Sequence, residues 1–181
     1  MSFAQTEKKL AEITDEGLFE KLATAVLRDG EPEYKALAHP GVNVAGKTVK
    51  SPVDAISFRS DTVPPHLYFV HHTITARDDL AKKWLHDPTK VKPRKKGKPT
   101  APEGDVLKVL RIVAEERART PNLKATLVLT TNQEPELQTT LDVAAAGSAA
   151  QIKIDLWTRS PPNPEDTYLP SSSIRRPPDF E

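Results

Sequence analysis

Runs of β-branched and apolar residues alternate with stretches of helical spacing along this chain, and that alternation limits the fold more than any other feature. The clearest strand-like runs are 66–75 (HLYFVHHTIT), 125–133 (ATLVLTTNQ) and 152–160 (IKIDLWTRS). Apolar residues recur at helical spacing at 14–28, 76–87, 104–119 and 134–150. Residues 41–58 add β-branched residues and a turn at Ala45-Gly46, which predicts two more strands. The order α-β-β-β-α-α-β-α-β predicts an α/β sandwich with a mixed sheet.

The first helix is predicted to begin after Thr14, which is a suitable N-cap, with acidic residues in the first turn. Its apolar residues fall at helical spacing and are expected to face the core. They are Leu18, Leu22, Ala25 and Val26.

The run 66–75 is apolar and aromatic on both sides, as expected of a central strand that pairs with its predecessor. Strand alternation places His71 and Thr73 on one face and His72 on the other. Polar groups buried in such a strand are costly unless they have partners. Asp54, on the preceding strand, is a suitable partner.

Cysteine is absent from the chain, which excludes disulfides, zinc–thiolate sites, iron–sulfur clusters and cysteine nucleophiles. The formal net charge is only +1, so no global bias indicates a nucleic-acid partner. No apolar run reaches the roughly 18 residues of a membrane span, and the N-terminus lacks the apolar core of a signal peptide. We therefore expect no membrane partner and a cytoplasmic location.

Prolines and basic residues mark two segments outside the regular pattern. A proline-flanked loop at 88–102 contains most of a basic run, and from Lys82 to Lys98 the local charge is +7 (eight bases, one acid). That loop favours phosphate contact and a solvated linker about equally. Candidate nucleic-acid ligands are Lys82, Lys83, Lys95 and Lys96. Six prolines beyond residue 160 predict a linker or tail at 161–181, after a globular domain at 1–160.

Three short motifs stand in a suggestive order: Glu20 in the first helix, Asp54 in a strand after Pro52, and His71 with Thr73 in the next strand. With the element order over about residues 14–160, they resemble the PD-(D/E)XK nuclease superfamily, particularly Mrr-like restriction endonucleases. The resemblance implies a restriction-endonuclease-like three-layer sandwich with a central mixed sheet. It also implies divalent-metal-dependent hydrolysis of DNA.

In that family a helix glutamate, the aspartate after proline and an acidic residue on the following strand bind metal, while a lysine two residues later assists the attacking water. Carried onto this chain, the ligands are Glu20, Asp54 and His71, and Thr73 stands in the place of the lysine. The implied cofactor is Mg²⁺ or Mn²⁺, and histidine suits Mn²⁺ or a transition metal better than Mg²⁺. Lys82 or Lys83, on the next helix, is a candidate for the missing ammonium.

Two functions from different classes follow from these substitutions. The first is an active nuclease with a modified site. The second is an inactive restriction-nuclease-like module that binds nucleic acid or protein. The end of the chain, PSSSIRRPPDFE, resembles linkers that lead into the nucleotide-binding module of STAND-type NTPases. That resemblance implies the N-terminal effector of a bacterial antiphage defence protein, which acts as a homo-oligomer driven by a C-terminal NTPase module.

Overall fold

The computed structural model describes residues 3–39, 51–90 and 102–159. This part of the chain is an α/β fold with helices on both faces of a mixed sheet. The helices are α1 (Phe3–Ala11), α2 (Glu16–Gly30), α3 (Leu80–Leu85), α4 (Asp105–Arg119) and α5 (Leu137–Ala149), with short 3₁₀ turns at Pro32–Tyr34 and Arg77–Asp79. The strands are β1 (Ala55–Arg59), β2 (His66–Thr73), β3 (Lys124–Thr131) and β4 (Lys153–Trp157).

Within the described ranges the strands follow the order β1-β2-β3-β4. β1 runs antiparallel to β2, while β2, β3 and β4 are mutually parallel and are joined through helices. The predicted strand at 66–75 is thus an interior strand, and its partner β1 begins directly after Asp54. Both expectations for this strand are confirmed.

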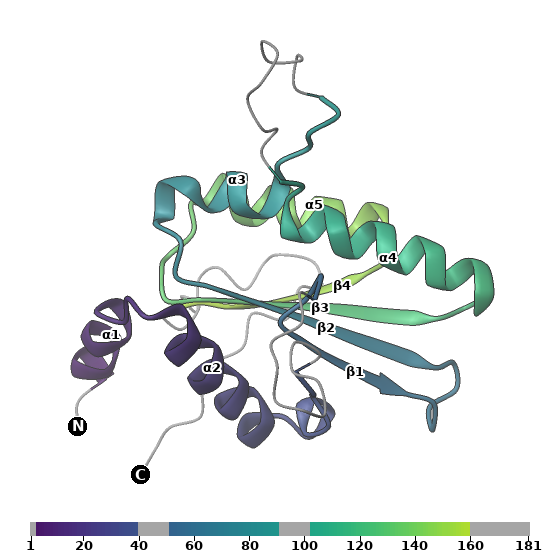
Figure 1. The fold of residues 1–181 in the computed structure, drawn as a ribbon, viewed down its shortest axis with the longest axis horizontal. Helices are drawn as coiled ribbons and strands as arrows, with labels where there is room; N and C mark the ends of the chain where they lie inside the picture. The colour runs from purple at the N-terminus through teal and green to yellow at the C-terminus, as the bar shows by residue number, and fades with distance from the viewer. Residues whose placement is uncertain (1–2, 40–50, 91–101, 160–181) are drawn as a thin grey trace.

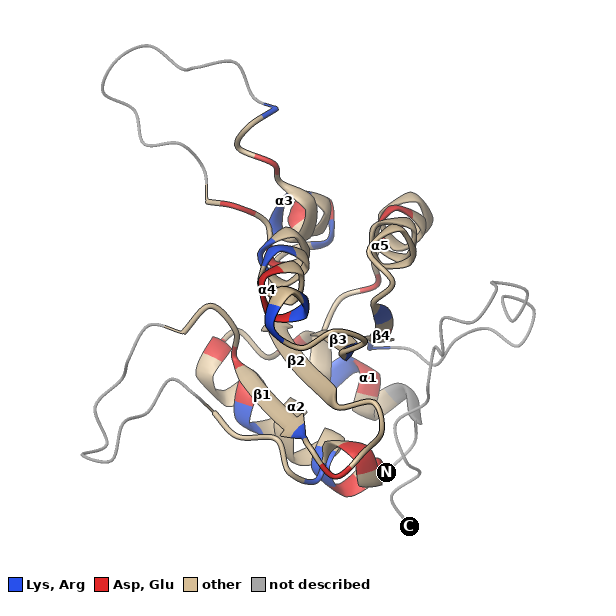
Figure 2. Cartoon of the chain, turned by 90° about the vertical axis from the view of Figure 1, so that its right-hand side faces the viewer, with Lys and Arg blue, Asp and Glu red and all other residues tan. Residues whose placement is uncertain are grey.

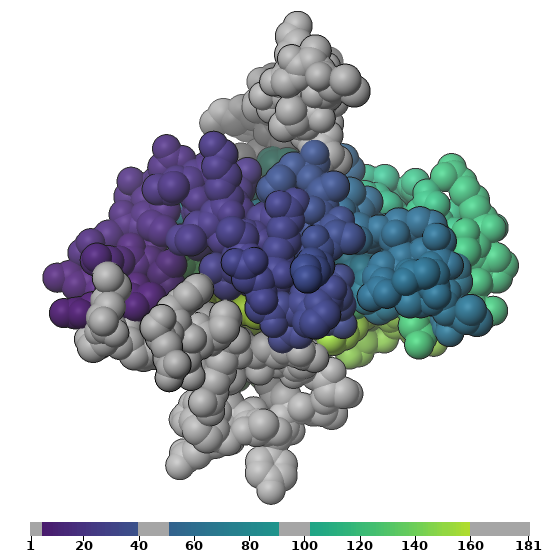
Figure 3. Space-filling view, turned by 90° about the horizontal axis from the view of Figure 1, so that it is seen from below, coloured from purple at the N-terminus to yellow at the C-terminus, as the bar shows by residue number. Residues whose placement is uncertain are grey.

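Two apolar clusters, one on each face of the sheet, define a three-layer sandwich. Leu67 and Phe69 pack under α3, α4 and α5, whereas Tyr68 and Val70 pack toward α2 and the 3₁₀ turn that follows it. Figure 1 shows α3, α4 and α5 on one side of the sheet and α1 and α2 on the other. In the space-filling view of the second side, the N-terminal residues form a broad layer over the sheet (Figure 3).

The first predicted helix is present as α2, but two details of the prediction are wrong. Its N-cap is Asp15 and not Thr14, because the Asp15 carboxylate accepts a hydrogen bond from the Leu18 N–H at 2.8 Å. Its apolar face is also displaced around the helix. The side chains turned to the sheet are Phe19, Thr24 and Leu27, Val26 is half-buried, and the exposed ones are Leu18, Leu22 and Ala25.

Helix α1 was not anticipated from the sequence. The Asn132 side chain, 2% exposed at the end of β3, donates to the Leu10 and Ile13 carbonyls at 3.1 and 3.0 Å. None of the α1 side chains that can be described is buried, so this amide is a principal attachment of the helix. No helix in the described ranges is long and apolar enough to cross a membrane.

The junction between α3 and α4 depends on a close approach at Gly104. The Gly104 N–H donates to the His86 carbonyl at 2.8 Å. A Cβ at this position would lie 2.4 Å from the Trp84 carbonyl oxygen and 2.6 Å from the His86 nitrogen. The first strand of the predicted hairpin with its turn at Ala45-Gly46, most of the basic loop and the tail at 161–181 lie outside the described residues.

Candidate functional site

Polar side chains gather where β2 and β3 end and β1 begins. His71, His72 and Thr73 occupy the last positions of β2, and in the register they lie opposite Leu129, Thr130 and Thr131 of β3. In open α/β sheets, ligands bind at the carboxyl ends of parallel strands. The topology therefore places the residues predicted from the sequence at a suitable edge.

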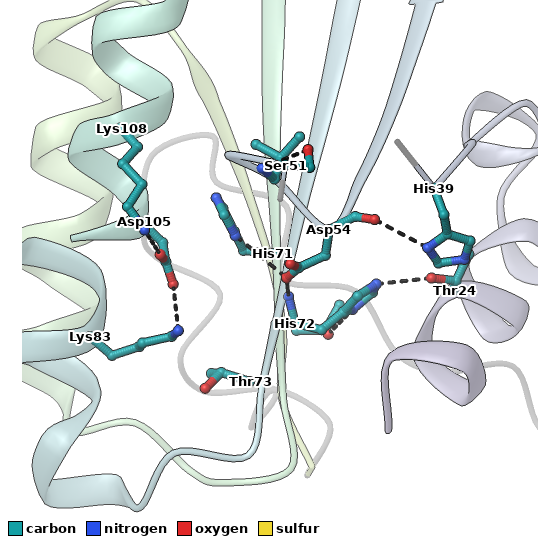
Figure 4. Close-up of polar contacts among 12 residues, drawn as sticks. Thr24, His39, Ser51, Asp54, His71, His72, Thr73, Lys83, Asp105 and Lys108 are labelled. Atoms are coloured by element: carbon teal, nitrogen blue, oxygen red, sulfur yellow. Dashed lines mark hydrogen bonds and ion pairs between the residues drawn. The ribbon is translucent and has the colours of Figure 1, made fainter. Parts of the chain in front are cut away.

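Asp54 is the centre of the hydrogen bonding at this edge. One carboxylate oxygen, Oδ2, accepts the His72 backbone N–H at 2.7 Å and lies 3.5 Å from His71 Nδ1 (Figure 4). The Asp54 N–H donates to the Val70 carbonyl at 3.0 Å, and the His39 ring contacts the Asp54 carbonyl at 3.1 Å. Burial pushes the pKa of Asp54 upward, but the hydrogen bonds from His71 and His72 outweigh it, so the pKa is lowered.

His71 is 5% exposed and lies on the side of the sheet that faces α4, as alternation predicts. Its Nδ1 faces Asp54, and its Nε2 is buried without a hydrogen-bond partner among the described residues. A carboxylate beside one imidazole nitrogen is the arrangement that orients histidine ligands and proton carriers in proteins.

His72 points to the opposite face and joins three elements. Its Nε2 lies 2.9 Å from the Thr24 hydroxyl on α2, and its Nδ1 lies 2.7 Å from the Thr130 hydroxyl on β3. The edge of the Phe19 ring packs against it. Burial lowers the pKa of His72 to about 4, so the ring is neutral at pH 7. This histidine is a structural link.

Glu20, on α2, lies within electrostatic range of Asp54. Burial raises the pKa of Glu20, and the charges of Asp54 and Glu16 raise it further, while His39 and Lys83 lower it. The charge of Asp54 therefore makes ionisation of Glu20 less favourable.

Thr73 bonds within the turn that follows β2. Its hydroxyl donates to the Thr75 hydroxyl at 2.7 Å and accepts the Thr75 N–H at 3.1 Å, so it closes the turn that ends β2. Lys82 is exposed on α3. The Lys83 ammonium lies on the His71 side of the strand, 3.4 Å from Asp105 Oδ2 (Figure 4).

The basic candidates are only partly described. Lys95 and Lys96 fall in the range 91–101, outside the described residues. Along α4, Lys and Arg alternate with Asp and Glu (Figure 2), so this helix carries both signs of charge. The exposed pairs on it include Arg111 with Glu115 and Arg119 with Glu116, which contribute little to stability.

The carboxylate oxygens of Asp54 and Glu20 are of the ligand type that a hard divalent cation prefers. Residues 3–39, 51–90 and 102–159 contain no group of three or more His, Asp or Glu side chains arranged to hold a metal ion. Asp54 and His71 are brought together, and Glu20 is near them only in electrostatic range. Mg²⁺ sites commonly use one or two carboxylates and complete their shell with water and substrate phosphate.

Sequence reasoning missed three residues of this region: Thr24, Thr130 and Asp105. Thr24 and Thr130 bind the ring of His72. A polar partner for this ring could have been expected from the sequence, because a buried histidine in a strand needs hydrogen-bond partners on its own face. Asp105 begins α4 and is 3% exposed, with lysines on both oxygens. An acid in the first turn of a helix is ordinarily exposed, so nothing in the sequence distinguished it.

Comparisons with known proteins add no family to this description. No protein-family model matches the chain, and no curated protein or solved structure matches it either.

Proposed function

We propose that this chain hydrolyses DNA phosphodiesters with a divalent cation bound at Asp54 and Glu20. The observation that carries the proposal is the position of Asp54 at the carboxyl end of β2, where its carboxylate accepts the His72 N–H at 2.7 Å and lies 3.5 Å from His71 Nδ1, with a second acid, Glu20, within electrostatic range. A bound cation offsets the charge of these acids, and the open edge of an α/β sheet is a common place for a ligand.

The cation, when bound, activates water and neutralises charge on the phosphate. The residues of the chain have separate tasks. The His72 N–H fixes the rotamer of Asp54 through one carboxylate oxygen, Oδ2. The other oxygen, Oδ1, is the atom proposed to bind the cation. His71 is proposed as a further ligand beside Asp54, and Lys82 and Lys83 contact phosphate groups of the DNA. Lys95 and Lys96 are proposed to extend the same contact along the basic loop.

The test is cleavage of supercoiled and linear DNA with Mg²⁺ and with Mn²⁺, by wild type and by Asp54→Asn. Asparagine retains an oxygen that accepts the His72 N–H, so the fold is preserved while the charge is lost. We expect at least about a 100-fold loss of rate, since a metal ligand contributes several kcal/mol. Binding of Mn²⁺, followed by its paramagnetic effect on water relaxation, should weaken in parallel.

Asp142→Asn is the matched control, because Asp142 is an exposed acid on α5 that only accepts a hydrogen bond from Gln138. It should cleave DNA and bind Mn²⁺ as wild type does. Equal behaviour of wild type and Asp54→Asn under every condition would refute the nuclease proposal.

A second candidate function is a catalytically inactive module that binds nucleic acid or protein. Two observations favour it: the Thr73 hydroxyl is used within its own turn, and no three-donor metal group occurs in the described ranges. The same assay separates the two candidates. An inactive module binds DNA or a protein partner and cleaves nothing with either cation.

The wider role is proposed on the sequence resemblance alone. We propose that this domain is the effector of a bacterial antiphage defence protein, in which self-association and a C-terminal NTPase module place two sites on one duplex. Linking sites in an assembly raises the local concentration of each, so a weak DNA contact becomes effective.

A further inference from the structure

A buried acid, Asp105, lies next to the site and holds two lysines. Asp105 is 3% exposed at the first position of α4, and burial of an isolated carboxylate is costly unless it is paired. Lys108, one turn along the same helix, reaches Oδ1 at 2.7 Å. Lys83, from α3, approaches Oδ2 at 3.4 Å. One negative charge is thus shared by two positive ones.

The two lysines differ in what else they face. Figure 4 shows them approaching Asp105 from opposite sides, with the Lys83 ammonium on the side of Thr73 and the end of β2. The Lys83 side chain is 37% exposed, against 28% for that of Lys108. Its charge also acts on Glu20, across the edge of the sheet. Lys108 pairs with Asp105 at i, i+3 on its own helix, where one cation already balances the buried acid.

We propose that Asp105 is a positioning residue that holds the Lys83 ammonium at the carboxyl end of β2, where it binds a phosphate group of nucleic acid. This inference rests on the proposed function, because it assigns a phosphate contact to the same site. Its basis is the shared carboxylate: Asp105 contacts the Lys83 ammonium on the side of the end of β2, whereas Lys108 approaches the same carboxylate from the opposite side.

Preorganisation is the physical advantage of this arrangement. A free lysine side chain loses rotamer entropy when it is fixed. Lys83 has already lost part of that freedom through its contact with Asp105, so binding a phosphate costs less. An exposed lysine on the same helix, such as Lys82, lacks this advantage.

The test is binding of a fluorescent DNA duplex, in EDTA, to wild type, Lys83→Met, Lys108→Met, Asp105→Asn and the double variant Lys83→Met/Asp105→Asn. Lys83→Met should weaken binding about fivefold and reduce the salt slope by about 1, as expected for one lost phosphate contact. Lys108→Met, which removes the same charge from the same carboxylate, should weaken binding less than twofold.

Asp105→Asn is the most informative variant, because a pure charge effect and a positioning role predict opposite changes in DNA affinity. Removal of an acid makes the surface more positive, which by charge alone tightens binding to DNA. If Asp105 positions Lys83, binding weakens when Lys83 is present and does not weaken further when Lys83 is already methionine. Tighter binding by Asp105→Asn, or equal losses in Lys83→Met and Lys108→Met, would overturn the inference.

Thermal unfolding of each variant shows whether it is still folded. If Asp105→Asn does not fold, the difference between Lys83→Met and Lys108→Met still decides the matter. The outcome is also separable from that of the proposed function. A wild type that binds DNA but cleaves nothing contradicts the nuclease and not the role of Lys83, whereas an active wild type with a tighter-binding Asp105→Asn variant contradicts this inference alone.

Discussion

The buried ring of His72 is neutral at pH 7 in the folded chain, and its protonation in mild acid should weaken the fold. Burial lowers the pKa of His72 to about 4 in the folded chain, against 6.5 for an ordinary histidine. Between these values the unfolded chain binds more protons than the folded one, so the free energy of unfolding rises with pH. This stability is complete above about pH 6.5 and is lost as the pH falls toward 4.

The size of the effect follows from the two pKa values. One pKa unit corresponds to about 1.4 kcal/mol, so the full loss is about 3 kcal/mol, of which about 2 kcal/mol is lost by pH 5. Replacement with glutamine keeps a polar side chain between the Thr24 and Thr130 hydroxyls and removes the titration. We expect His72→Gln to flatten the dependence of unfolding free energy on pH between 7 and 5, as measured by urea unfolding followed by circular dichroism.

His66→Gln is the matched control on the same strand. Burial lowers the pKa of His66 as well, but that side chain is only half-buried, so most of the pH dependence should remain after its replacement. A His72→Gln variant that loses stability between pH 7 and 5 as wild type does would refute the assignment. Asp54, whose pKa is lowered, contributes only below the range of this measurement.

Two further predictions concern the scaffold. Gly104→Ala should lower the free energy of unfolding, measured in urea, by more than about 2 kcal/mol, because the added Cβ meets backbone atoms of two residues. Gly17→Ala, whose added Cβ has its nearest contact at 3.4 Å, should be neutral or stabilising, and equal effects of the two variants would contradict the close-approach argument. Asn132→Ala removes the side-chain hydrogen bonds to the Leu10 and Ile13 carbonyls and should speed amide hydrogen exchange in residues 3–13 more than elsewhere. An equal increase in exchange rate along the whole chain would show that other contacts hold α1.

The strands were predictable because their period is fixed by the backbone. Alternation assigned His71 and His72 to opposite faces, and the structure confirms it, since every second side chain of a strand must share a face. The interior position of this strand also followed from its apolar character on both sides. The mixed α/β class was correct for the same reason, because helical and strand periods alternate along the chain.

The face of α2 was not predictable in the same way. The helix carries two apolar stripes, one through Leu18 and Leu22 and one through Phe19 and Leu27, and periodicity alone cannot choose between them. The choice depends on Thr24, which is buried because it serves the ring of His72. The buried face of a helix can be predicted in such a case only when its contacts with residues distant in sequence are known. The burial of Asp105 is a second case, because it depends on lysines from two helices.

The Asn132 bonds to the end of α1 have a consequence for synthesis on the ribosome. Asn132 and Leu10 are 122 residues apart, and Tyr34 in the turn after α2 donates to Asp155 across 121 residues. The first helices therefore leave the exit tunnel long before their partners exist. Contacts over such sequence separations form only after the intervening chain has been made and its loop-closure entropy has been overcome. The N-terminal third therefore has to remain unaggregated until β3 and β4 emerge. The exposed charges along α1 and α2, rather than a folded core, keep this segment soluble in the interval.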